Sequence, residues 1–121
     1  MNKKQVEQEQ KNKIKKLFKT AEHKFNEFEY EECSLIIEDI LKINKNSINS
    51  LNLGAICLIN MDRPKEAIKY FKQSVKISPK TDYFKYMYLG QLSIGFESVK
   101  YYKLGITFLE EKLKVSCFIF N

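Results

Sequence analysis

The side chains able to catalyse a reaction are few and far apart in this sequence. Its single histidine, His23, stands beside Glu22 and Lys24 and has no cysteine, serine or aspartate cluster near it. A catalytic nucleophile needs a base within hydrogen-bonding reach, and the sequence suggests no such pair. We therefore expect a protein that is not an enzyme, with His23 on its surface.

The cysteines argue against a metal site. Cys33, Cys57 and Cys117 are widely spaced, and none has a close cysteine or histidine. Zinc sites need closely spaced cysteine or histidine pairs, and secreted disulfide frameworks need an even number of cysteines, whereas this chain has three. Core packing is the expected role of Cys33 and Cys57, and we expect no metal and no cofactor.

Charge is distributed unevenly along the 121 residues, whose formal net charge is +6. Residues 1–19 hold seven lysines and two glutamates, whereas residues 20–41 hold seven acidic residues and one lysine. The lysine-rich start is interpreted either as a nuclear localisation signal or RNA-touching arm, or as the solvated start of a helix. The second interpretation is favoured because no aromatic residue accompanies the lysines to stack on bases, so direct nucleic-acid binding is not expected. The acidic segment predicts a patch made by Glu27, Glu29, Glu31, Glu32, Glu38 and Asp39.

The composition, 44% hydrophobic and 30% charged, is typical of a soluble, packed protein of one domain. No apolar run approaches the roughly 20 residues that span a bilayer. The residues after Met1 are polar, unlike the start of a secretory signal. These features predict a cytoplasmic or nuclear protein with no membrane partner.

Core-type residues recur along the chain with a shift of 34 residues. A period of about 34 is the length of the helix–turn–helix repeat in tetratricopeptide arrays. Several of the recurring residues are small, as neighbouring helices need at their points of closest approach. The recurring pairs include Ala21 and Ala55, Cys33 and Ala67, and Ile37 and Phe71.

Apolar spacing predicts helices from about Asn12 to a turn at 27–29, then over 30–43, from 48 to a turn at 62–64, and over 64–77. Pro64 suits the first position of a helix, and Pro79 ends one. Ala55 and Ala67 are expected to be buried between these helices.

The third repeat departs from the pattern, because its second helix matches with a shift of 31 residues. The simplest place for the missing residues is the turn at Gly95. Thr81 or Asp82 is expected to cap the fifth helix, and the sixth is expected to end near Lys114. The predicted organisation is a flexible basic leader at 1–12, a domain at 13–114 with repeats of about 14–47, 48–81 and 82–114, and an apolar tail at 115–121. That tail either covers the last helical face or is a non-native end; both interpretations stay open.

The stretch from Arg63 to Phe71, closed by Pro79, resembles the second helix of a tetratricopeptide repeat. The resemblance implies an all-α fold, a short tetratricopeptide-type α-solenoid of about three helical hairpins, which binds proteins rather than catalysing reactions. In that fold the first helix of each repeat lines a concave groove, here suited to an extended or helical peptide. The groove positions carried over are Phe18, Glu22 and Asn26 from the first repeat, Asn49, Asn52, Ile56 and Asn60 from the second, and Met87 and Gln91 from the third.

A narrower resemblance lies in residues 86–93, Tyr-Met-Tyr-Leu-Gly-Gln-Leu-Ser, with Gly105 and Ile106 downstream. This segment is similar to the shortened third repeat of a eukaryotic tetratricopeptide family, the dedicated assembly chaperones of large-subunit ribosomal protein four. The resemblance implies a basic ribosomal protein as partner and a role in ribosome biogenesis. The alternative is a generic adaptor or scaffold subunit that holds a helix or peptide of a larger complex.

Overall fold

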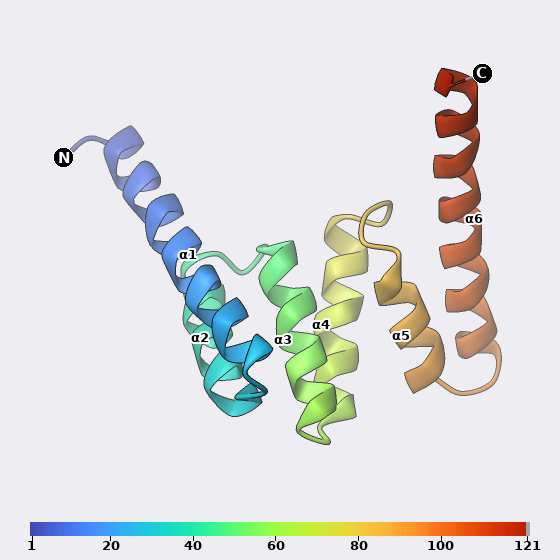
Figure 1. Cartoon of the computed structure of the whole chain (residues 1–121), viewed down its shortest axis with the longest axis horizontal. Helices are drawn as coiled ribbons and strands as arrows, with labels where there is room; N and C mark the ends of the chain where they lie inside the picture. Colours follow the sequence, from blue (N-terminus) through green and yellow to red (C-terminus); the bar gives the residue numbers. More distant parts are fainter. Residues whose placement is uncertain (121) are drawn as a thin grey trace. The chain divides into compact units, whose positions relative to one another are not determined.

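The computed structural model describes residues 1–120 of the chain, with side chains as far as residue 115. In this described part the chain forms six α-helices and no strand, as Figure 1 shows. The helices group into two compact units, Met1–Tyr70 and Phe71–Asn121, with the division inside the fourth helix. The helices are α1 (Lys3–Asn26), α2 (Tyr30–Ile43), α3 (Ile48–Asn60), α4 (Pro64–Ile77), α5 (Phe84–Leu92) and α6 (Phe96–Phe120).

The turns inside the first two hairpins have the same hydrogen bonds. Phe28 and Asp62 take the left-handed conformation, with φ of 64° and 58°. The N–H of the next residue then bonds back to the last turn of the preceding helix, from Glu29 to the Lys24 carbonyl at 2.9 Å and from Arg63 to the Leu58 carbonyl at 2.8 Å. This arrangement satisfies carbonyls that the helix end would leave open. The period of 34 therefore repeats a turn as well as a core pattern.

The third repeat is short in its first helix and not in its turn. The connections within the three hairpins are 27–29, 61–63 and 93–95, so they are equal in length. Helix α5 has 9 residues, whereas α3 has 13. The prediction that the turn at Gly95 lost residues was therefore wrong, although Gly95 does adopt the positive φ, 64°, that this turn needs.

The core of the first unit is built from small and branched side chains of α1, α2 and α3. Ala55 and Ala67 are fully buried, which confirms the prediction made from the repeat. A Cβ atom on Gly54 would lie 2.8 Å from Cγ2 of Ile37 and 2.9 Å from Cε2 of Tyr70, so only glycine fits there without movement. The buried cluster comprises Ala21, Cys33, Ile37, Ile40 and Cys57. Cys33 and Cys57 thus have the packing role expected, while the side chain of Cys117 lies outside the described residues.

The second unit packs through aromatic rings. Phe71 of α4 is fully buried and stacks on Tyr88 of α5, with ring centroids 5.2 Å apart. In the α5–α6 hairpin, a Cβ atom on Gly105 would lie 2.8 Å from Cβ of the buried Tyr86. Gly105 therefore sets how closely these two helices approach.

The start of α1 and the end of α6 differ from the predicted boundaries. Helix α1 begins at Lys3 rather than near Asn12, because the side chains of Asn2 and Gln5 cap its start reciprocally. The segment assigned to a flexible leader is thus helical, and its flexibility stays a prediction. Helix α6 runs to Phe120 and does not end near Lys114.

The fifth helix begins without the predicted cap. Tyr83 occupies the capping position of α5, and its own side chain makes no capping hydrogen bond. The Thr81 hydroxyl instead lies 2.7 Å from that of Ser78, so it closes the loop after α4. Asp82 lies in the same loop and takes a positive φ of 50°.

Lys85 of α5 is fully buried, and its ammonium group lies at the C-terminal end of α4. Its Nζ donates to the Ser74 carbonyl at 3.3 Å, to the Ser74 hydroxyl at 3.2 Å and to the Ser78 carbonyl at 2.5 Å. A cation is favourable at this end of a helix, where the carbonyls point outward. Burial nevertheless lowers the pKa of the Lys85 ammonium from its usual value, and the charge of Asp82 acts in the opposite direction.

Lys85→Met should destabilise the protein by about 1–3 kcal/mol at neutral pH, because two carbonyls and a hydroxyl each lose the Lys85 ammonium as a hydrogen-bond donor. The difference in the free energy of unfolding between the wild type and the variant should grow as pH rises. Native Lys85 releases its proton below the usual pKa of 10.5, so above its native pKa the unfolded state binds more protons than the folded state. The stability of the wild type relative to the variant should therefore increase through that window and level off near pH 10.5. Denaturation of both proteins between pH 7 and pH 11 measures this difference, and a difference independent of pH would contradict it.

Candidate functional site

The potential catalytic groups do not come together in the described residues. His23 is exposed, and its Nε2 lies 3.1 Å from Oε1 of Glu27 on the same helix face. No group of three or more histidine, cysteine, aspartate or glutamate side chains could hold a metal ion in the part of the chain that the structure describes. Among these residues, no helix has the length and apolar character needed to cross a membrane.

A hollow of about 350 Å³ lies between α1 and the start of α3. Three of the predicted groove residues, Phe18, Glu22 and Asn49, line it. Ile14 and Phe18 are half-buried and one helical turn apart, so they form an apolar strip on α1. We refer to this hollow as the groove. It is lined by Lys11, Ile14, Lys15, Phe18, Lys19 and Glu22 of α1, with Ser47 and Asn49.

Three lysines give the groove a positive character. Lys11, Lys15 and Lys19 follow one another at intervals of one helical turn along α1 and are exposed. None of them has an ion pair among the described residues. Glu22 offsets one of these charges at the end of the strip.

The other predicted groove residues lie elsewhere. Asn52 is only 4% exposed, so its side chain is in the packed interior and does not face a ligand, contrary to its expected position. Ile56 is half-buried, and the exposed Asn60 donates from Nδ2 to the Ile56 carbonyl at 2.9 Å. Asn26 is exposed near the end of α1. Met87 and Gln91 are exposed on α5, in the second unit.

Most of the predicted acidic patch is tied into ion pairs. Lys24 contacts Glu29 at 2.8 Å and Glu32 at 3.3 Å. The hydrogen bond to Glu29 is the main reason that the pKa of Lys24 is raised, and the pKa of Glu29 is lowered by the same bond. Glu27 lies 3.1 Å from Nε2 of His23, a contact that is an ion pair only when this histidine is protonated, and Asp39 lies 3.8 Å from Lys42.

Glu31 and Glu38 are the exception within this patch. Both are exposed on α2, two helical turns apart, and neither has an ion pair in the described residues. Leu35 stands between them on the same face and is 56% exposed. The outer face of α2 therefore combines unneutralised negative charge with an exposed apolar side chain.

A second hollow, of about 490 Å³, opens at the tip of the first hairpin. We refer to it as the tip hollow. Its apolar lining includes Phe28 from the α1–α2 turn, Leu35 from α2 and Met61 from the α3–α4 turn. Its remaining lining residues are Glu29, Tyr30, Glu31 and Glu32.

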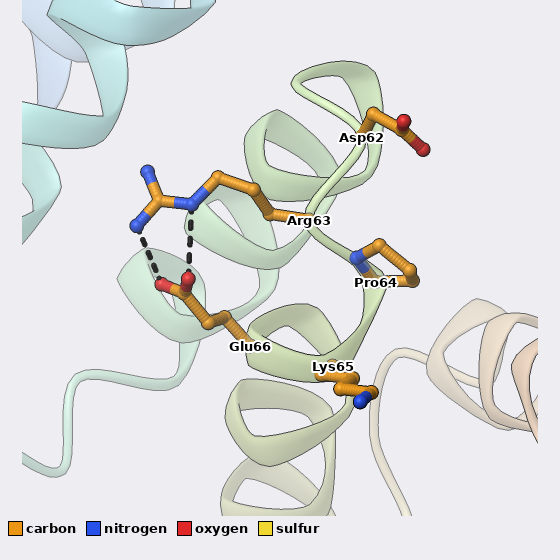
Figure 2. Close-up of a pocket in the computed structure, with 5 residues that line it drawn as sticks. All are labelled: Asp62, Arg63, Pro64, Lys65 and Glu66. Carbon is orange, nitrogen blue, oxygen red and sulfur yellow. Dashed lines mark hydrogen bonds and ion pairs between the residues drawn. The ribbon is translucent and has the colours of Figure 1, made fainter.

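A third hollow, of about 340 Å³, surrounds the start of α4 and is shown in Figure 2. Nε and one terminal nitrogen of Arg63 each bond one oxygen of Glu66, at 2.9 and 2.8 Å. Asp62 and Lys65 point away from this pair. This bidentate pair of Arg63 and Glu66 links the predicted turn before Pro64 to the first turn of α4. Its two charges neutralise one another.

The sequence did not show which charged residues line each hollow. From the sequence, the lysines of the groove are interpreted as a nuclear localisation signal or RNA-touching arm, or as the solvated start of a helix, although the spacing of four residues between Lys11, Lys15 and Lys19 places them on one helix face. In the sequence, only the glutamates of the tip hollow indicate a binding surface. Leu35 and Met61 are far apart in the chain and come together only when the first two hairpins stack.

Of the comparisons with known proteins, the one with solved structures found a match, and it supports the fold. No family model and none of the curated proteins matches this sequence. Among solved structures, the chain is similar to one titled "Crystal structure of MamA", a tetratricopeptide-like protein, with a TM-score of 0.78 and 18% sequence identity. The match covers 84% of this chain and spans 61% of the length of that one. The chain therefore has a tetratricopeptide-like helical-repeat fold, all-α and of the short solenoid type, which confirms the predicted fold class.

Proposed function

We propose that this chain is a non-enzymatic protein-binding module that holds a segment of a partner in the groove between α1 and α3. The observation that carries the proposal is the lining of the groove, where the apolar strip of Ile14 and Phe18 is bordered by polar groups. An apolar floor supplies affinity, and a few polar groups at its edge fix the orientation of the bound chain. The amide of Asn49 can both donate to and accept from a peptide backbone.

The charge of the groove favours an acidic segment. Within residues 1–115, whose side chains the structure describes, Lys11, Lys15 and Lys19 form no ion pair that would compete with a bound carboxylate. A nucleic acid fits less well, because the half-buried Phe18 leaves only part of its surface for stacking on a base, and Glu22 repels phosphates. The expected ligand is a peptide or helix with an apolar side chain between acidic residues, as an adaptor subunit would hold.

Lys15→Glu combined with Lys19→Glu should weaken binding of a labelled peptide with one leucine flanked by two glutamates on each side. The expected loss is about tenfold or more in Kd, since attraction becomes repulsion at two positions. Lys13→Glu combined with Lys16→Glu is the matched control, because it changes the net charge equally on the same helix but outside the groove lining. Fluorescence anisotropy measures both. Equal losses in the two variants, or tighter binding of a single-stranded RNA of similar length than of the peptide, would refute the groove proposal.

A finer proposal is that the partner is a basic ribosomal protein and that the chain acts as its assembly chaperone in the cytoplasm or nucleus. It is supported by the resemblance of residues 86–93 and by the outer face of α2, where Glu31 and Glu38 are exposed and form no ion pair with any described side chain. Such a client would bind this acidic face and not the positive groove. Substitution of Glu31, Glu32 and Glu38 by lysine tests this proposal, since it reverses the charge of the acidic face.

A further inference from the structure

Phe28 is held in an unusual position at the tip of the first hairpin. Its φ is 64°, in the left-handed region that a bulky side chain rarely adopts. Helices that end in this way usually place glycine there. The ring of Phe28 is nevertheless 77% exposed and contacts Tyr30 edge-on, with centroids 6.3 Å apart. The turn therefore presents a large aromatic side chain to solvent in a strained backbone conformation.

The exposed ring belongs to an apolar surface contributed by three elements. Leu35 of α2 is more than half exposed, and Met61 of the α3–α4 turn is half-buried beside it. Together with Phe28 they line the tip hollow of about 490 Å³, a volume within the range of sites that bind small ligands or single side chains. Scattered apolar residues on a surface need no explanation, but a hollow lined by three of them is a candidate binding surface.

The rim of the tip hollow is negative. Glu29, Glu31 and Glu32 line it, and Lys24 neutralises part of this charge through its contacts with Glu29 and Glu32. The dipole of α2 explains why glutamates stand in its first turn. It does not explain why apolar side chains open to solvent lie among them.

We propose that the tip hollow binds a basic segment of a partner protein, through one large apolar side chain flanked by arginine or lysine residues. The apolar side chain would insert between Phe28, Leu35 and Met61, while its basic neighbours would contact Glu31 and the other rim carboxylates. Such charge complementarity selects the partner and guides its approach. The same charge disfavours nucleic acids and anionic membrane surfaces.

The inference rests on the protein-binding function proposed above. It concerns a different surface from the groove, with the opposite charge, and this surface shares Glu31 and Leu35 with the outer face of α2. The groove lies between α1 and the start of α3, and the two hollows have no lining residue in common. Binding at the tip hollow can therefore be tested independently of binding in the groove.

Phe28→Gly separates a binding role from a structural one. Glycine adopts φ of 64° without strain, so the variant should be at least as stable to heat as the wild type. It should nevertheless lose about tenfold or more in affinity for a labelled peptide with one phenylalanine flanked by two arginines on each side. Leu35→Ser should lose affinity similarly. Ile94→Ser is the control, because Ile94 is 91% exposed in the turn of another hairpin, and its affinity should stay at the wild-type value.

Comparison with a second peptide, in which serine replaces the phenylalanine, isolates the apolar contribution. The wild type should bind the serine peptide at least about tenfold more weakly. Equal affinity for the two peptides, unchanged binding by Phe28→Gly, or no binding of the first peptide to the wild type would each overturn the inference. The groove variant Lys15→Glu/Lys19→Glu should keep its affinity for the basic peptide. Failure of the acidic peptide alone would therefore refute the groove and leave the tip hollow standing.

Discussion

Phe71→Ala should lower the free energy of unfolding by about 3–5 kcal/mol, the cost of deleting a fully buried phenylalanine. Phe71 is fully buried, and its ring stacks on that of Tyr88 of α5. The substitution removes this aromatic contact and leaves a cavity that the rigid helices cannot fill by relaxation. Urea denaturation followed by circular dichroism measures the loss.

Phe84→Ala provides the comparison for this result. Phe84 lies at the start of α5 and contacts the same tyrosine edge-on, with centroids 6.3 Å apart, but it is 41% exposed. Its replacement should cost about 1 kcal/mol or less, since little apolar surface is removed from the interior. Similar losses for the two variants would mean that Phe71 does not lie in the core of its unit.

Reversal of three charges on α2 should abolish binding of a basic ribosomal client. In the variant Glu31→Lys/Glu32→Lys/Glu38→Lys, each attraction between exposed charges becomes a repulsion. If each lost attraction and each new repulsion is worth about 0.5 kcal/mol, the three reversals together amount to roughly 3 kcal/mol, or about a hundredfold in Kd. Isothermal titration of large-subunit ribosomal protein four into each protein measures the effect. Wild-type binding should also weaken as salt is added, because exposed charges are screened.

The matched control reverses three exposed glutamates outside the acidic patch, in the variant Glu7→Lys/Glu9→Lys/Glu110→Lys. It changes the net charge by the same amount, so it reports any general effect of a more basic protein. Binding of the client should fall much less than in the α2 variant. If both variants bind as the wild type does, or lose affinity equally, the acidic face of α2 does not hold the client.

The repeat spacing was sufficient to predict most of the core. The apolar stripes predicted for α1 and α2 contain the buried residues Ala21, Cys33 and Ile37. The prediction succeeds here because each of these helices has one packed face. The turn at Asp62 to Pro64 also follows from local chemistry, since proline suits the first position of a helix and aspartate tolerates a positive φ.

The burial of Asn52 shows where the assumption that a helix buries only one face fails. Helix α3 packs against α2, and its Gly54 also meets Tyr70 of α4, so more than one of its faces is covered. A helix covered on several sides buries polar residues that a single apolar stripe would place on the surface. Ser50, at the start of α3, is fully buried for the same reason, and its hydroxyl accepts a hydrogen bond from Ser47 at 2.8 Å.

The tip hollow and the buried lysine depend on contacts that no local pattern contains. Phe28 corresponds to Asp62 in the repeat, and nothing in a phenylalanine side chain indicates a left-handed conformation. Lys85 looks like an ordinary surface residue until the end of α4 supplies three acceptors for its ammonium. Such features follow from the stacking of hairpins and become visible only in three dimensions.

The central claim is that the first unit, Met1–Tyr70, carries two separate binding surfaces of opposite charge. Two-dimensional ¹H–¹⁵N spectra of the protein, recorded with the leucine–glutamate peptide and separately with the phenylalanine–arginine peptide, test it most directly. The acidic peptide should shift the amide signals of Lys15, Phe18 and Asn49. The basic peptide should shift those of Phe28, Leu35 and Met61. Shifts of one common set of residues by both peptides, or of neither set, would contradict the claim.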